Sequence, residues 1–424
     1  ESSQHFSRSS TSGEAVRNYR DHPSTMPPMT DGPLPDDPFG AMPFFGELMR
    51  MMHGAGPGGA DAARQLARSI ANDGQTEANI NPTDRIAVEQ LVRVAELHVA
   101  QVTDLPVARG GALQVDVGNR SQWADRTVGD YKNLFAALSE SMAAGASAPD
   151  DISSGDPMAS MLEGLSKMIG PMMLSMTTGS MVGNIAQRAL GGYELPVPRP
   201  ADQPLLILLR NVDAFGNDWS LNRDDLRLWV CLHEVAHHAV LGVPHVRRQL
   251  DNLLIRHARA FETNPEAIQQ QLGSVDLSGG TDGLAELQSM MSDPEALLGA
   301  VRSPAQEAIQ PELTALIAAI TGYVDHVMDT IGATLIGSYD MLAEALRRRR
   351  VEANTNDRFV ERILGLELDA AQYDRGATFA TGVVERAGKE GLSRLWSDPS
   401  HIPTTAEVDA PGLWLARIDL PSGR

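Results

Sequence analysis

Two histidines and a glutamate stand at a spacing that can hold a metal ion and use it. His233, Glu234 and His237 form the pattern His-Glu-x-x-His inside an apolar helical run at 226–240. Residues four apart lie on one face of an α-helix, so both imidazoles can reach one ion. Glu234 lies about 100° round the helix from His233, where its carboxylate can act on a metal-bound water. The spacing is typical of metal-assisted hydrolases.

The same pattern also has a purely structural interpretation, in which buried histidines pair with a glutamate in a core helix. Burying three such groups together without a metal is costly. Asn222 is positioned to cap the helix and Asp225 lies in its first turn, which favours a true helix. We therefore expect Zn²⁺ as the cofactor, with His233 and His237 as metal ligands and Glu234 as the catalytic base.

The overall charge excludes one class of partner. The 424 residues carry 55 Asp and Glu against 35 Lys and Arg, a net charge of −20, with a sequence pI near 4.9. Such a chain is repelled by polyanions, so we expect no nucleic-acid partner. The His-Glu-x-x-His motif on a helix is a pattern of metalloproteases, so the partner we expect is a peptide or protein substrate.

The cysteine count and the hydropathy bear on location. Cys231 is the single cysteine, which excludes an internal disulfide and predicts a cytoplasmic protein. The least polar window, 168–187, is rich in Met, Ser, Thr and Gly and contains Pro171. That composition is poor for a membrane helix, so no stable membrane span is expected.

The chain divides into three parts by composition. Residues 1–40 are rich in Ser, Pro and Asp and are predicted to be disordered. Residues 41–200 are predicted to form a helical N-terminal region, and 201–424 the catalytic domain. Within that domain, 264–300 is rich in Gln, Gly, Ser and Asp, which predicts a flexible insertion over a cleft.

Apolar periodicity places the elements that must position the motif. Helices are expected at 60–72, 82–102, 123–143 and 250–261, a long Met-rich helix at 158–190, and a pair between Glu312 and Arg350 that meets near Gly332 or Gly337. The stretch 205–209 predicts the one clear strand, followed by a polar loop through Asn217. Arg347–Arg350 is interpreted as a solvated helix end.

Several further blocks resemble a known family. The motif block from Trp229 to Val240 resembles the zincin-like metallopeptidase type 2 family of bacterial hydrolases, as do Gly322–Asp329 and the block 362–376. Gly191–Pro196 and 395–414 are similar to further family blocks, and the resemblance covers about 155–420 in family order. It implies a mostly α fold, with a zincin-like metallopeptidase core, a small β-sheet and long helical additions. It also implies zinc-dependent protease activity.

One position departs from the family pattern. The family commonly has Glu-Gly-x-x-Asp where this chain has Thr321-Gly-Tyr-Val-Asp325, so Thr321 replaces the usual third-ligand glutamate. Catalytic zinc requires three protein ligands and a water. We predict that Asp325 completes the metal site with His233 and His237. Its other role would be to orient a ligand histidine, and Glu312 or Glu361 are the alternative acids.

Two rival functions belong to another class. In one, the weakened site leaves an inactive zincin-fold protein that acts as a binding or scaffold partner. In the other, the apolar patch Phe44–Met52 and the Met-rich helix dock a protein partner.

Overall fold

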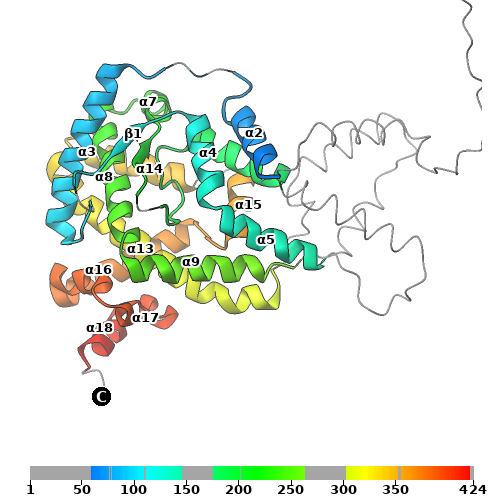
Figure 1. Cartoon of the computed structure of the whole chain (residues 1–424). Helices are drawn as coiled ribbons and strands as arrows, with labels where there is room; N and C mark the ends of the chain where they lie inside the picture. Colours follow the sequence, from blue (N-terminus) through cyan, green and yellow to red (C-terminus); the bar gives the residue numbers. More distant parts are fainter. Residues whose placement is uncertain are drawn as a thin grey trace, which may run out of the picture. The chain divides into compact units, whose positions relative to one another are not determined.

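The fold is built almost entirely from helices around one two-stranded sheet (Figure 1). The computed structural model describes residues 59–145, 175–262 and 302–420, apart from positions 76, 78, 109, 110, 201 and 352–354. These residues belong to one compact unit, 57–424. The predicted class, mostly α with a small sheet, is confirmed.

Within the described ranges, the helices follow one another in chain order. The N-terminal half holds α2 (Gly59–Ala71), α3 (Pro82–Thr103), α4 (Arg120–Asp130), α5 (Lys132–Gly145), a helical stretch at 175–188, α7 (Leu209–Asp218), α8 (Arg223–Leu241) and α9 (Pro244–Arg259). The C-terminal half holds α13 (Pro304–Leu335), α14 (Tyr339–Val351), α15 (Thr355–Leu364), α16 (Ala370–Ser393), α17 (Thr405–Asp409) and α18 (Pro411–Asp419), with single 3-10 turns at Arg394–Trp396 and Pro399–His401.

The sheet pairs two short strands in parallel. β1 (Val115–Val117) lies beside β2 (Leu205–Ile207), with Val115 opposite Leu205. All of β2 is buried, as its unbroken apolar sequence predicted. The predicted loop through Asn217 is wrong: α7 begins at Leu209 and buries Val212 and Gly216 on one side. β1 was not predicted, because three residues are too few to show a strand pattern.

The helix predicted at 123–143 is instead two helices. α4 starts at a capping box formed by Asn119 and Gln122, and it ends at Tyr131, whose backbone leaves the helical region. Tyr131 is buried and its ring contacts that of Phe135. The break between the two helices therefore lets this aromatic pair pack against the core. The paired helices predicted between Glu312 and Arg350 are confirmed as α13 and α14, with Gly337 in the connection.

α13 is the central helix of the unit. It is buried along most of its length and packs on α8, α9 and α16. Its closest approach is to α16, where a Cβ added at Gly322 would lie 2.1 Å from the carbonyl oxygen of Gly376. Only glycine allows two helix backbones to lie this close together.

Gly322→Ala should lower the free energy of unfolding by about 1–3 kcal/mol, because the obstacle is backbone and cannot turn aside. Urea unfolding followed by circular dichroism measures this. The matched control is Gly337→Ala, which has nothing within 4 Å of its added Cβ and should change stability by less than about 0.5 kcal/mol. Equal effects of the two variants would show that the crossing of α13 and α16 tolerates a methyl group.

His257 on α9 is fully buried between α9, α13 and Gly365. Burial, assisted by the positive charge of Arg302, lowers the pKa of His257 from 6.5 to about 4. The unfolded chain therefore binds this proton at higher pH than the folded one. The stability contributed by neutral His257 is complete above about pH 6.5 and is lost as the pH falls through about 4.

His257→Leu should accordingly flatten the pH dependence of stability between about pH 4 and 7. The flattening should reach at most about 3 kcal/mol, the value of a shift of this size. The measurement is urea unfolding of wild type and variant across that range. Parallel curves for the two proteins would rule out His257 as a source of acid sensitivity.

Several predicted features lie outside the described residues. These are the N-terminal segment 1–40, the patch Phe44–Met52, the insertion 264–300 and most of the Met-rich helix, of which 175–188 is helical. The core contains side chains from both sides of position 200, and the predicted division into domains stays a prediction. Among the residues that the structure describes, no helix has the length and apolar character needed to cross a membrane.

Candidate active site

The motif lies on α8, a helix buried on nearly all sides. Asn222 caps its start by accepting hydrogen bonds from the backbone N–H groups of Asp224 and Asp225, both at 3.0 Å. The rings of His233 and His237 lie 4.3 Å apart by centroid, and Trp229 stacks on His233 at 4.8 Å. The predicted spacing therefore places both imidazoles on one face.

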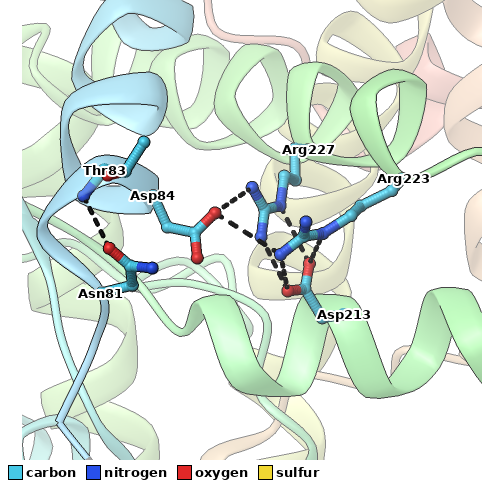
Figure 2. A network of polar contacts seen from close by, with 6 residues as sticks. All are labelled: Asn81, Thr83, Asp84, Asp213, Arg223 and Arg227. Atoms are coloured by element: carbon cyan, nitrogen blue, oxygen red, sulfur yellow. Dashed lines mark hydrogen bonds and ion pairs between the residues drawn. The ribbon is translucent and has the colours of Figure 1, made fainter.

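Charged contacts hold the first turns of α8 in place. Arg227, 5% exposed, binds Asp84 of α3 at 3.0 Å and Asp213 of α7 at 2.7 Å. Arg223 reaches the same two carboxylates, and Figure 2 shows the two guanidinium groups between them. Asn81, which caps α3 through the backbone N–H of Thr83, stands beside this cluster. α8 is thus tied to both neighbouring helices about two turns before its histidines.

Glu234 faces a backbone segment instead of solvent. Its side chain is 2% exposed, and its carboxylate accepts a 2.9 Å hydrogen bond from the backbone N–H of Tyr193. The neighbouring N–H of Gly192 donates to the Leu206 carbonyl of β2 at 2.8 Å. A Cβ on Gly191 would lie 2.3 Å from the Glu234 carboxyl carbon, so glycine is required there. Burial raises the pKa of Glu234 to about 8, although the two backbone N–H groups oppose the rise.

The segment 191–193 is itself anchored to the sheet and to α4. Gly191 forms an antiparallel bridge with Ile207 of β2, and its carbonyl accepts a 2.7 Å hydrogen bond from the Trp123 indole. Arg199 donates to the Gly192 carbonyl and forms a buried ion pair with Asp130 at 3.0 Å. The position of Glu234 is therefore set by the sheet and by α4 as well as by α8.

Both histidines are held neutral. Burial lowers the pKa of His237 to about 4 and that of His233 well below 6.5, and the positive charge of Arg350 acts in the same direction on both. Nδ1 of His237 lies 3.1 Å from the His233 carbonyl, which leaves Nε2 for another partner. Neutral imidazole is the form that binds a metal.

The cavity above the motif has a volume of about 60 Å³. Besides the three motif residues it is lined by charged and aromatic side chains from α13, α14, α15 and α16 and from the segment before β2. They include Glu194, Asp325, Arg349, Arg350, Glu361 and Tyr373. The predicted site residues His233, Glu234, His237 and Asp325 thus share one cavity, whereas Glu312 does not line it.

The candidate third ligands stand in different surroundings. Both carboxylate oxygens of Asp325 lie 3.0 Å from Nη1 of Arg350. Thr321 lines the cavity but donates its hydroxyl to the Ile317 carbonyl at 3.0 Å. Glu361 lies 3.5 Å from Arg358, and the exposed Glu312 binds Gln249.

The donor set fits zinc in part. Two neutral imidazoles on one helix face are suitable ligands, and Asp325 supplies a carboxylate to the same cavity. As the described residues are arranged, no three His, Cys, Asp or Glu side chains form a group that could hold a metal. In this arrangement Asp325 is paired with Arg350, and its role as a ligand stays a prediction.

Sequence reasoning missed the arginines of this cavity. Arg349 and Arg350 end α14 and point into the site, so the interpretation of this cluster as a solvated end is wrong for these two. Arg347 and Arg348 are exposed as predicted. The run of four arginines is visible in the sequence, but no short-range sequence pattern indicates that its last member contacts Asp325.

Comparison with known proteins is consistent with this geometry. The chain resembles the solved structure of "a putative hydrolase with a novel fold" from Chloroflexus aurantiacus, with a TM-score of 0.56 and 23% identity, covering 85% of this chain and 99% of the other. At that identity the likeness shows a shared fold. No curated protein matches the chain.

A family model carries the assignment further. The model described as zincin-like metallopeptidase matches residues 60–415, which include the motif, the cavity and the central helix α13. The match covers most of the chain and confirms the resemblance seen in the sequence. This chain therefore belongs to the zincin-like metallopeptidase family.

Proposed function

We propose that the protein is a zinc-dependent metallopeptidase that hydrolyses peptide bonds with Glu234 as the general base. The observation that carries the proposal is the shared cavity of two neutral imidazoles and the buried carboxylate of Glu234. When bound, zinc would activate a water and polarise the scissile carbonyl. His233 and His237 would hold it, with Asp325 as the third ligand.

Proton transfer and the orientation of the catalytic carboxylate are assigned to residues of the chain. Glu234 takes a proton from the attacking water and passes it to the leaving amine. The ionised carboxylate accepts the proton in the first half of this transfer, and the protonated carboxyl group returns it in the second. The backbone N–H of Tyr193 holds the carboxylate in one orientation between the two steps.

The first test of this proposal is the zinc content of the purified chain by elemental mass spectrometry. We expect about one zinc per chain, and its loss in His237→Ala, because a single imidazole and a carboxylate bind zinc weakly. His245→Ala is the matched control, since His245 lies outside the cavity and should keep the metal. Zinc-free wild type, even after zinc is added, would refute the proposal.

A second candidate function is a binding or scaffold protein whose catalytic site has weakened. The ion pair of Asp325 with Arg350 and the inward hydrogen bond of Thr321 favour it. It predicts no turnover of any peptide library and a partner interaction that survives Glu234→Gln. Docking of a partner through Phe44–Met52 belongs to this candidate and remains a prediction.

A cytoplasmic location is proposed on the cysteine alone. Cys231 is buried, and burial raises the pKa of its thiol to about 12, so it is unreactive. A single buried cysteine cannot form the internal disulfides that are typical of proteins in oxidising compartments.

A further inference from the structure

The last turn of α14 brings two positive charges into the cavity that holds the histidines. Nη2 of Arg349 lies 2.8 Å from Glu194, and Nη1 of Arg350 lies 3.0 Å from both oxygens of Asp325. The Arg350 guanidinium also rests 4.8 Å above the Tyr373 ring. Both arginine side chains are about four-fifths buried. The site therefore has a cationic wall opposite its imidazoles.

Asp325 cannot serve Arg350 and a metal ion equally well. A carboxylate that ligates zinc shares its charge with the ion, so zinc ligation by Asp325 would weaken its ion pair with Arg350. A largely buried guanidinium with no anion is costly. Arg350 needs a second anion only when zinc is bound, so the role inferred for it rests on the proposed function.

The other carboxylates of the cavity already have cationic neighbours. Glu194 binds Arg349, with Arg188 at 3.9 Å, and Glu361 lies beside Arg358. Among the described cavity residues, Glu234 is the remaining acid, and it faces the segment 191–193. Glu194 also acts electrostatically on Arg350, but its carboxylate is shared between Arg349 and Arg188. In the described lining of the cavity no acid is left for Arg350 alone, so a bound molecule is the source we consider for its second anion.

We propose that Arg350 recognises a carboxylate of the substrate, which takes the place of Asp325 when Asp325 turns to the metal. A guanidinium binds carboxylates through two parallel N–H groups, and Tyr373 holds the plane of this one. The preferred substrates are peptides with a carboxylate close to the scissile bond. That carboxylate is either a free C-terminus or an Asp or Glu side chain.

The first arm of the test measures zinc affinity by competition with a chromophoric chelator. Arg350→Met should bind zinc about tenfold more tightly than wild type, because Asp325 no longer has to leave a partner. Asp325→Asn should bind it more weakly. Arg348→Met is the matched control, an arginine of the same helix turn that pairs with the exposed Glu344 and should leave zinc affinity unchanged.

The second arm measures peptide binding to the zinc-loaded Glu234→Gln protein by fluorescence polarisation. Three peptides share one sequence: one amidated and neutral, one with a free C-terminus, and one amidated with an added Glu. At least one carboxylate peptide should bind about tenfold more tightly than the neutral one, and which of them does so identifies the source. Adding Arg350→Met should remove the preference, whereas Arg348→Met should keep it.

The outcomes separate this inference from the proposed function. If zinc binds but the three peptides bind equally, or none binds, Arg350 does not recognise a carboxylate, although the metallopeptidase proposal stands. A preference that survives Arg350→Met also overturns the inference. If zinc never binds, the proposed function itself has failed. Arg350→Lys, which keeps the charge but loses the planar fork, should retain part of the preference and guards against misfolding of the Met variant.

Discussion

Glu234→Gln should reduce peptide hydrolysis by about 10²- to 10⁴-fold while the protein keeps its zinc. Glutamine has the shape of glutamate, and its carbonyl oxygen can still accept the hydrogen bond from the Tyr193 backbone N–H. What it loses is the ability to take a proton. The measurement is the initial rate on a peptide library, beside the zinc content of both proteins.

Two control variants make this result specific. Glu312→Gln changes an exposed carboxyl group on α13 outside the cavity and should leave both rate and zinc unchanged. Glu361→Gln changes another buried glutamate that lines the cavity, and loss of zinc there would identify Glu361 as the third ligand in place of Asp325. Unreduced hydrolysis by Glu234→Gln would remove the general base from the mechanism.

Asp130→Ala should lower the free energy of unfolding by about 3–5 kcal/mol, the largest stability effect expected in this chain. The side chains of Asp130 and Arg199 are 3% and 8% exposed, and their charges lie 3.0 Å apart. Removing the carboxylate leaves the guanidinium buried against Trp123 and Tyr131 without its ion-pair partner. Urea unfolding of the two proteins measures the difference.

The same helix provides the control for this prediction. Asp125 on α4 pairs with Arg68 at 2.6 Å, but Arg68 is 55% exposed. Water screens this pair, so Asp125→Ala should cost less than about 1 kcal/mol. If the two variants lose equal stability, burial does not distinguish the pairs.

Asp130→Ala also tests how the site is held together. Arg199 donates to the carbonyl of Gly192, which belongs to the same peptide group as the Tyr193 N–H that donates to Glu234. A loosened Arg199 should therefore lower the hydrolysis rate even at temperatures where the variant is fully folded. Asp125→Ala, which leaves Arg199 in place, should not.

The sequence by itself determined that His233 and His237 share one face of a helix and that Glu234 lies beside them. Each depends on local geometry: four residues make about one helical turn, so His233 and His237 share a face wherever α8 packs. The capping residues Asn81 and Asn222 likewise set the starts of α3 and α8 through contacts two or three residues away. Such features need no knowledge of distant parts of the chain.

Only the tertiary structure decided what surrounds the motif. Glu234 meets Tyr193 from 41 residues away, and Asp325 meets Arg350 from 25. No periodicity links such positions, because their contact results from how α13, α14 and the sheet pack around α8. For the same reason the sequence does not distinguish the four arginines of the run Arg347–Arg350. Packing buries the last two in the cavity that holds the histidines and leaves the first two exposed to water.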